Sequence, residues 1–225
     1  MVTYCLHADV DLAFAKSVNP EDVLTFDDGH YNVYAARHEL STLPNRKVIF
    51  ITPSYVAPES RETPPRREVY YQYDRVFNSN SQFMTLSEIT ELLNLGFELG
   101  MHSFYHDLVY VDGQTPVDRY WRMHKLAKTP LGLTALCRMY GTTSALAEPG
   151  VDRVDGLVRR RTQTEFAEFV ARDTELCVEW FAKNLFVPNA YAFPFFIGSE
   201  LLLSELSKYK ITNVLGRRPR PVMNN

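Results

Sequence analysis

The sequence predicts an α/β fold, a distorted (β/α) barrel formed by a single domain. Short apolar runs with strand character alternate along the chain with segments of helical periodicity. This alternation requires parallel strand pairing with the helices outside the sheet, and the number of strand-like runs fits a barrel better than a sandwich. The length of 225 residues suits one domain with a full core, so residues 1–225 are expected to form one domain.

Three strands and one helix are expected near the start of the chain. Apolar and β-branched runs at residues 3–6, 23–26 and 48–52 indicate strands, and the second run ends in a polar Asp-Asp-Gly turn. Residues 31–43 have the pattern of a helix, which Pro44 ends.

A long irregular segment precedes the second helix. Residues 53–81 are rich in Pro, Arg, Tyr and Asn and show no period, which predicts a surface excursion of a kind that is often functional. Thr85 and Glu88 then have the spacing of a capping box, in which each side chain binds the backbone N–H of the other. The helix that follows is closed by Gly96, and a strand at residues 97–101 comes directly after it.

The second half of the chain contains a segment without a clear pattern and then the best helix of the sequence. Residues 109–162 are expected to form an insertion or a lid. Thr162 and Glu165 repeat the capping-box spacing. A wide apolar stripe follows at Phe166, Phe169, Val170, Leu176, Cys177, Trp180 and Phe181. The last expected elements are a strand, a helix and a strand at residues 190–193, 200–209 and 211–215.

Composition and charge exclude several classes of protein. Lys and Arg total 24 against 27 Asp and Glu, a net charge of −3, which disfavours a nucleic-acid partner. No apolar run approaches the ~18–20 residues of a membrane span, and the N-terminal segment lacks the features of a secretory signal. The chain has three cysteines, an odd number that cannot all pair within the chain: Cys5, Cys137 and Cys177. Each lies in an apolar stretch, which indicates buried thiols in a reducing compartment. A cytoplasmic location is therefore expected.

Two adjacent carboxylates follow the strand expected at residues 23–26. In α/β folds, sites are built at the carboxyl ends of strands, where Asp27 and Asp28 lie. Neighbouring carboxylates repel each other, so burying both requires a cation or a shared proton. The alternative is a plain Asp-Asp-Gly turn on the surface.

Two histidines four residues apart follow the strand expected at residues 97–101. On a helical turn, the rings of His102 and His106 would face one side and share a metal ion. Two imidazoles and one carboxylate leave an open coordination position, as a catalytic zinc site requires. Alone, such a pair is often two polar surface residues. Here, however, both this pair and the Asp27–Asp28 pair follow a predicted strand, which favours a shared site.

Both motifs together resemble the polysaccharide deacetylases of carbohydrate esterase family 4. The family's first motif is matched by the segment TFDDG at residues 25–29, and the second by HSFYH at residues 102–106. The resemblance runs from about residue 23 to 108 and again from about 165 to 215. It implies a distorted (β/α) barrel of the deacetylase type and a hydrolase that removes acetyl groups from an N-acetylated sugar or polysaccharide.

The resemblance also implies roles for individual residues. Asp28, His102 and His106 would bind one divalent metal ion, most commonly Zn²⁺. Asp27 would act as the general base towards a metal-bound water, the nucleophile. His30, Tyr105 and Pro194 are expected to contact the carbohydrate substrate.

The chain departs from the family at its third motif and in its later motifs, so it is expected to be a divergent member. Ala192 stands where the family has an arginine that orients the catalytic aspartate. Phe195 stands where it has a tyrosine, and its backbone N–H is expected to stabilise the oxyanion. No histidine follows His124, so the general acid of the later motifs is missing. Some relatives have a permuted motif order, and the strand before His7 makes that residue the candidate acid.

Two alternative functions remain open on the sequence. Related barrels include C–N amidohydrolases that act on a small cyclic amide. The altered third motif and the missing later motifs are also compatible with a non-catalytic glycan-binding relative.

Overall fold

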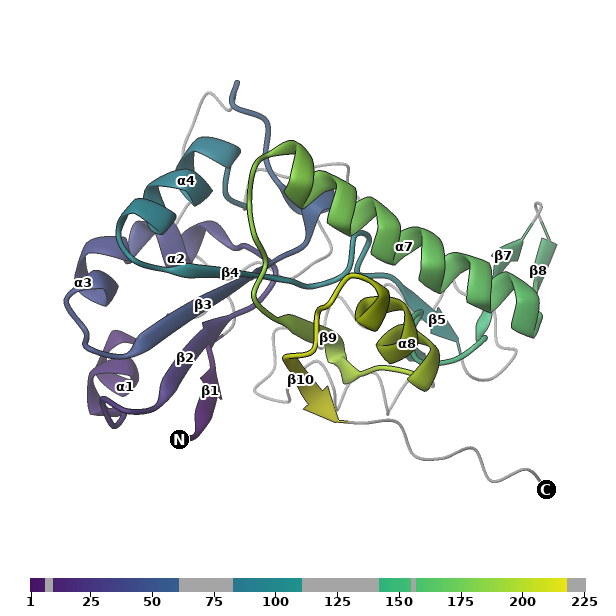
Figure 1. Cartoon of the computed structure of the whole chain (residues 1–225), viewed down its shortest axis with the longest axis horizontal. Coiled ribbons are helices and arrows are strands. Elements are labelled where there is room, and N and C mark those ends of the chain that lie inside the picture. Colours follow the sequence, from purple (N-terminus) through teal and green to yellow (C-terminus); the bar gives the residue numbers. More distant parts are fainter. Residues whose placement is uncertain (7–9, 61–82, 111–141, 155–156, 218–225) are drawn as a thin grey trace. The chain divides into compact units, whose positions relative to one another are not determined.

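The computed structural model of the chain describes residues 1–6, 10–60, 83–110, 142–154 and 157–217 (Figure 1). It contains two compact units. The first comprises Met1–Tyr105 and Trp180–Tyr191, and the second comprises His106–Glu179 and Ala192–Asn225. The units are described separately below.

A parallel sheet forms the centre of the first unit. Strands β1 (Thr3–Cys5), β2 (Val23–Phe26), β3 (Arg46–Ile51) and β4 (Glu98–Met101) pair side by side in this order, each parallel to the next. Strand β9 (Tyr191–Ile197) joins β4 in parallel through Tyr191 and Met101. The carboxyl ends of β2, β3 and β4 therefore lie along one edge of the sheet.

The expectation of an α/β fold with parallel strands is confirmed, but a closed barrel is not formed. The sheet has six strands in the order β1-β2-β3-β4-β9-β10, so β1 and β10 (Val214–Arg217) are its two edges. Closing a barrel requires the edge strands to pair with each other. The other described strands form a separate antiparallel sheet, which leaves these edges open.

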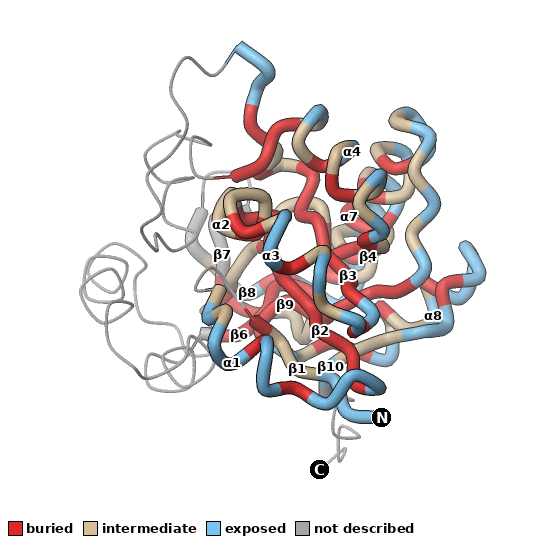
Figure 2. The backbone as a smooth tube through the Cα atoms, turned by 90° about the vertical axis from the view of Figure 1, so that its left-hand side faces the viewer, coloured by how far each residue is buried: buried red, intermediate tan, exposed pale blue. Residues whose placement is uncertain are grey.

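The central strands are buried along nearly their whole length, as Figure 2 shows. All four residues of β2 are buried, and only the first residue of β3 is exposed. Leu24, Phe26, Ile49 and Phe50 have no exposed surface. Parallel strands that are covered on both faces have such continuous apolar runs, which is why the sequence identified β2 and β3 well.

Short helices accompany these strands in the first unit. Helix α1 (Leu12–Ser17) was not expected from the sequence; Asp11 caps its N-terminus by accepting from the N–H groups of residues 13 and 14. The single helix expected at residues 31–43 is two helices, α2 (Tyr31–Ala35) and α3 (Arg37–Ser41). Ala36, with φ −97° and ψ 8°, departs from helical geometry and separates them. A 3₁₀ turn, η1 (Pro53–Tyr55), follows β3.

Helix α4 (Leu86–Asn94) confirms the first capping box. The Thr85 hydroxyl accepts from the Glu88 N–H at 3.2 Å, and the Glu88 carboxylate accepts from the Thr85 N–H at 2.8 Å. Gly96, with φ +86°, ends this segment in the left-handed conformation that favours glycine. Strand β4 begins two residues later and carries the chain to His102.

The second unit contains an antiparallel sheet in the order β6-β5-β7-β8. Its strands are β5 (Leu108–Tyr110), β6 (Thr142–Ser144), β7 (Val151–Val154) and β8 (Leu157–Arg160). The expected insertion at residues 109–162 thus includes most of a small sheet. Residues 111–141 of that segment, like residues 61–82 of the expected surface excursion, lie outside the described residues.

The longest of the described helices, α7 (Gln163–Lys183), begins at the second capping box. The Thr162 hydroxyl accepts from the Glu165 N–H at 3.2 Å, and the Glu165 carboxylate accepts from the Thr162 N–H at 2.7 Å. Four members of the expected apolar stripe are buried: Phe166, Val170, Cys177 and Phe181. Helix α8 (Glu200–Lys208) follows β9 and is capped by Ser199.

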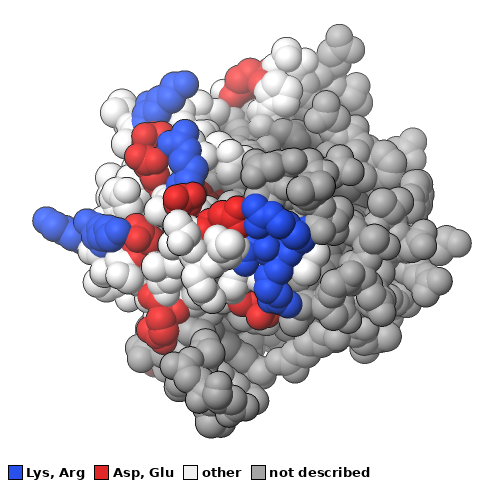
Figure 3. Space-filling model, turned by 90° about the vertical axis from the view of Figure 1, so that its right-hand side faces the viewer, with Lys and Arg blue, Asp and Glu red and all other residues white. Residues whose placement is uncertain are grey.

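Charged side chains on the described surface are mixed in sign. On the face drawn in Figure 3, basic and acidic groups lie next to one another. Within the second unit, ion pairs join Arg159 to Glu165 and Lys208 to Glu205. None of the described helices combines the length and hydrophobicity that crossing a membrane requires.

Candidate metal centre

The two adjacent carboxylates at the end of β2 are buried, so they do not form a plain surface turn. Asp27 is 4% exposed and Asp28 is 2% exposed. Asp28 has φ +69° and Gly29 has φ +78°, so the chain turns sharply through two left-handed residues. A Cβ at Gly29 would lie 3.2 Å from Ile51 Cδ1, and the Gly29 carbonyl accepts from the Met84 N–H at 2.9 Å. The turn is therefore fixed on both sides.

The two histidines follow β4 on a turn and not on a helix. The His102 N–H donates to the Ile51 carbonyl at 3.1 Å, and the Thr52 hydroxyl donates to the His102 carbonyl at 3.2 Å. Ser103 and His106 have φ of +70° and +56°. The expected helical geometry is thus wrong, because left-handed backbone at Ser103 and His106 is incompatible with a helical turn.

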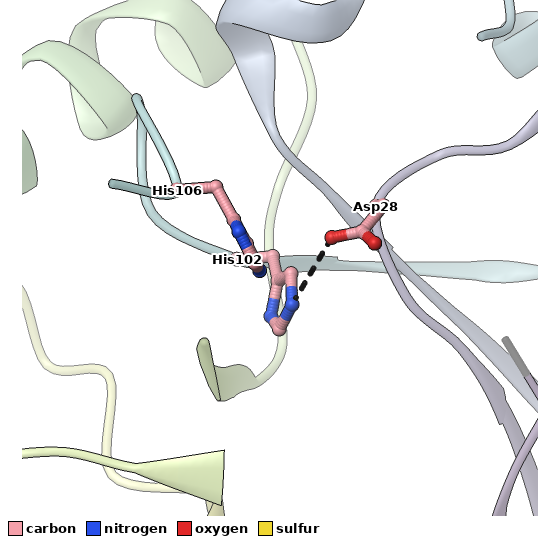
Figure 4. Close-up of side chains that lie close together, drawn as sticks. All are labelled: Asp28, His102 and His106. Carbon is pink, nitrogen blue, oxygen red and sulfur yellow. Dashed lines mark ion pairs between the residues drawn. The ribbon is translucent and has the colours of Figure 1, made fainter. Parts of the chain in front are cut away.

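These turns bring three possible ligands together, as Figure 4 shows. The Nε2 atom of His102 lies 3.3 Å from Oδ1 of Asp28. One ligand atom each of Asp28, His102 and His106 lies within 4.8 Å of the other two, and all three side chains are buried. His106 is the first residue of the second unit.

The donor set fits a divalent ion such as Zn²⁺. Carboxylate oxygen and imidazole nitrogen bind zinc at about 2.0–2.2 Å, which in a tetrahedral site puts neighbouring ligand atoms roughly 3.3 Å apart. The Asp28–His102 distance of 3.3 Å matches that spacing. A cation would also offset the repulsion between the buried Asp27 and Asp28 carboxylates.

Asp27 is contacted by a thiol that the sequence did not identify as part of the site. Cys5 Sγ donates to Asp27 Oδ2 at 3.1 Å. Burial, followed by the charge of Asp27, raises the pKa of the Cys5 thiol far above its ordinary value, so the thiol stays neutral and keeps its proton. The contact depends on the pairing of Cys5 with Thr25 across β1 and β2, and no sequence motif encodes that register.

His30 lies next to the possible metal ligand Asp28, two residues further along the chain. It is 4% exposed, and its ring stacks on Phe83 with the ring centres 4.8 Å apart. Its Nε2 atom lies 3.5 Å from Oδ2 of Asp28, the oxygen other than the one near His102. The sequence placed His30 in the site but gave no indication of this contact.

The remaining site residues expected from the sequence lie in three places. Phe195 is buried in β9 with φ +58°, and its ring centre lies 4.5 Å from that of His106. Pro194 is buried beside it, and Tyr105 is half-buried with its ring edge-on to Phe104 at 4.8 Å. His7 lies outside the described residues.

Comparison with known proteins gives similarity of structure alone. No protein-family model and no curated protein matches the chain in sequence. The fold is similar to the deacetylase domain of BpsB from Bordetella bronchiseptica, with TM-score 0.60 and 17% identity over 88% of this chain and 64% of that domain. The chain thus spans less than two thirds of that protein's length.

Two further solved structures are similar. A de-N-acetylase from Aggregatibacter actinomycetemcomitans has TM-score 0.57 and 16% identity over 94% of this chain and 70% of its own. IcaB from Ammonifex degensii has TM-score 0.51 and 15% identity over 89% of this chain and 68% of its own. At these identities the comparisons establish a shared fold, and they fit a divergent relative.

Proposed function

We propose that the chain is a metal-dependent deacetylase that removes acetyl groups from an N-acetylated sugar or polysaccharide. The observation that carries this proposal is the buried Asp28–His102–His106 cluster. Its placement at the carboxyl ends of parallel strands, where α/β folds build their sites, supports it. The similarity in fold to proteins described as a deacetylase and a de-N-acetylase supports the choice of substrate class.

In this proposal, Asp28, His102 and His106 hold one divalent ion, with zinc as the expected metal. Such an ion supplies Lewis acidity, which lowers the pKa of a water molecule and polarises a carbonyl. Asp27 is adjacent in sequence to the ligand Asp28, and we assign it the role of general base that takes the proton from the attacking water. The neutral Cys5 thiol holds one oxygen of the Asp27 carboxylate, and unlike a cationic partner it adds no positive charge that would lower the basicity of Asp27.

The other residues singled out in the sequence are assigned to the oxyanion, to substrate contact and to general acid catalysis. We assign the backbone N–H of Phe195 to the oxyanion of the tetrahedral intermediate. We propose that Tyr105 and Pro194 contact the substrate, as the sequence suggested, whereas His30, at 4% exposed, is buried beside Asp28. His7 stays the candidate general acid on sequence grounds.

Acetate release by the zinc-loaded full chain tests the proposal. The substrates are N-acetylglucosamine oligomers of increasing length, and Asp27→Asn is the informative variant because it keeps the shape of the side chain. General bases contribute about 10²–10⁴-fold to rate, so this variant should lose that factor while its zinc content stays unchanged. His38→Ala, a change at an exposed imidazole, is the matched control.

Three results would contradict the proposal. Near-native turnover by Asp27→Asn would show that Asp27 is not the general base. Zinc binding with no acetate released from any oligomer would favour a non-catalytic glycan-binding protein. Opening of a cyclic imide without acetate release would favour an amidohydrolase.

A further inference from the structure

We infer that His30 is a positioning residue for the metal ligand Asp28, an inference that rests on the metal site proposed above. His30 Nε2 lies 3.5 Å from Asp28 Oδ2, while His102 Nε2 lies 3.3 Å from Asp28 Oδ1. The two imidazoles therefore contact different oxygens of one carboxylate. A contact on Oδ2 fixes the rotation of the carboxylate, so that Oδ1 stays directed towards His102.

His30 is itself held in place from several directions. Its ring stacks on Phe83 at an interplanar angle of 24°, and Phe83 in turn packs against Tyr55 with 4.6 Å between ring centres. Its backbone forms an antiparallel bridge to Phe83 and caps helix α2, with its carbonyl accepting from the Val33 N–H at 3.2 Å. A side chain fixed in this way can orient a neighbour at little further entropic cost.

His30 does not belong to the ligand set. Among the described residues, the cluster of ligand atoms comprises Asp28, His102 and His106, without His30. His30 Nε2 lies 3.5 Å from Asp28 Oδ2, outside the roughly 2.7–3.2 Å of an N–H···O hydrogen bond, so the two buried groups are in polar contact and a shift of a few tenths of an ångström would bring them into hydrogen-bond range. Contacts of this kind are often long before a site is loaded and tighten afterwards.

The chemistry predicts a role in metal affinity. Ligating carboxylates are commonly hydrogen-bonded by an outer partner, and removing such a partner costs about 10–100-fold in metal affinity. The burial of His30 at 4% exposed surface leaves little of the ring for a large carbohydrate to contact. Orienting Asp28 is therefore the role that its position favours.

Calorimetric titration of Zn²⁺ into the metal-free full chain tests the inference without any substrate. His30→Phe keeps a flat ring for stacking on Phe83 but removes the donor, and its affinity should fall by about 10–100-fold. His30→Gln restores a donor, so its zinc affinity should be closer to that of the wild type than the affinity of His30→Phe is. His38→Ala, at an exposed imidazole, controls for loss of a surface histidine.

The outcomes separate this inference from the metal site itself. Wild-type affinity in His30→Phe, with zinc still bound, overturns only the positioning role. An absence of zinc binding by the wild-type chain overturns the site and this inference with it. If His30→Phe fails to fold, His30→Leu, which also lacks a donor, replaces it: an affinity about tenfold or more below that of His30→Gln supports the role, and equal affinities of these two variants contradict it.

Cobalt absorption tests whether His30 is itself a ligand. With Co²⁺ at saturation, the visible spectrum of His30→Phe should match that of the wild type, because the ligand set is unchanged. His106→Ala should change the spectrum, since it removes a ligand. A spectrum of His30→Phe altered in the same way as that of His106→Ala would make His30 a ligand and overturn the inference.

Discussion

At the scale of single residues, the candidate site is built on backbone conformations that non-glycine residues rarely adopt. Asp28 and His106 have φ of +69° and +56°, and Ser103 between the histidines has φ +70°. Such conformations cost roughly 1–3 kcal/mol each and persist where the surrounding structure fixes them, often at functional sites. Here they occur in the two turns that carry the possible metal ligands Asp28, His102 and His106.

The Cys5 thiol gives the first prediction at this scale. Because burial and the Asp27 carboxylate raise the pKa of Cys5, the reactive thiolate is scarce at pH 8. Alkylation of Cys5 by iodoacetamide in the native chain should be at least about tenfold slower than in the urea-unfolded chain, measured by mass spectrometry of the peptide that contains it. Asp27→Asn should react faster than the wild type. Equal rates in the native and unfolded chains would refute the contact as drawn.

The sequence identified part of the site at this scale. The sequence singled out Asp28, His102 and His106, which the structure brings together, because each belongs to a short local motif at the end of an apolar strand. The contacts of Cys5 with Asp27 and of His30 with Asp28 were not found, since they join side chains through strand register and ring packing. Local sequence patterns carry no information about either.

At the scale of elements, the N-terminus of α7 combines a capping box with an ion pair. Arg159 donates to both oxygens of Glu165, at 2.8 and 2.6 Å, and Thr162 donates its backbone N–H to the same carboxylate. These bonds, those from Arg159 first, lower the pKa of Glu165 to about 2. The contribution to stability is thus present above the unfolded pKa of about 4.3 and is lost as the pH falls towards 2.

Acid titration of stability tests this account of α7. The free energy of urea unfolding should be higher for the wild type than for Glu165→Gln at pH 6, because glutamine keeps a capping group but not the charge. This difference should shrink between pH 4.5 and pH 2.5, as the glutamate of the unfolded chain and then of the folded chain becomes protonated. A difference that stays constant over this range would show that the charge of Glu165 does not stabilise the helix.

The close approach of β3 and β4 gives a second prediction at this scale. A Cβ at Gly100 would lie 2.4 Å from two ring atoms of Phe50 and 3.0 Å from the Ala190 carbonyl. Phe50 is fully buried, so Gly100→Ala should destabilise the fold by about 1–3 kcal/mol or more in urea unfolding. The substitution Phe50→Leu should lower the free energy of unfolding by less in the Gly100→Ala background than in the wild type. Additive effects would mean that this ring does not limit the space at Gly100.

Regular elements were predicted where local signals are strong. Both capping boxes and the buried runs of β2 and β3 were correct because each is defined within a few residues. The helix expected at residues 31–43 was wrong in being continuous, since nothing local announces the break at Ala36. The antiparallel sheet β5–β8 was missed, in part because its strands are short and β5 pairs with β6 and β7 across distant segments. The pairing of β7 with β8 is local, and the Asp-Gly dipeptide at residues 155–156 between them is a hairpin signal that was overlooked.

At the scale of the whole molecule, the alternation of strands and helices predicted the α/β class and parallel pairing. It did not predict that the six-stranded sheet stays open, because closure depends on whether edge strands meet and not on how many strands there are. The fold is shared with three solved structures at 15–17% identity, and fold alone does not transfer the chemistry of those proteins. The function therefore depends on whether Asp28, His102 and His106 act together.

Calorimetric titration of zinc into the metal-free full chain measures this most directly. The wild type should bind one Zn²⁺ per chain, and His106→Ala and Asp28→Ala should each weaken binding by more than the 10–100-fold expected for an outer partner. His38→Ala should bind as the wild type does. A chain that binds no zinc, or that binds it equally well without His106 and without Asp28, would contradict the account.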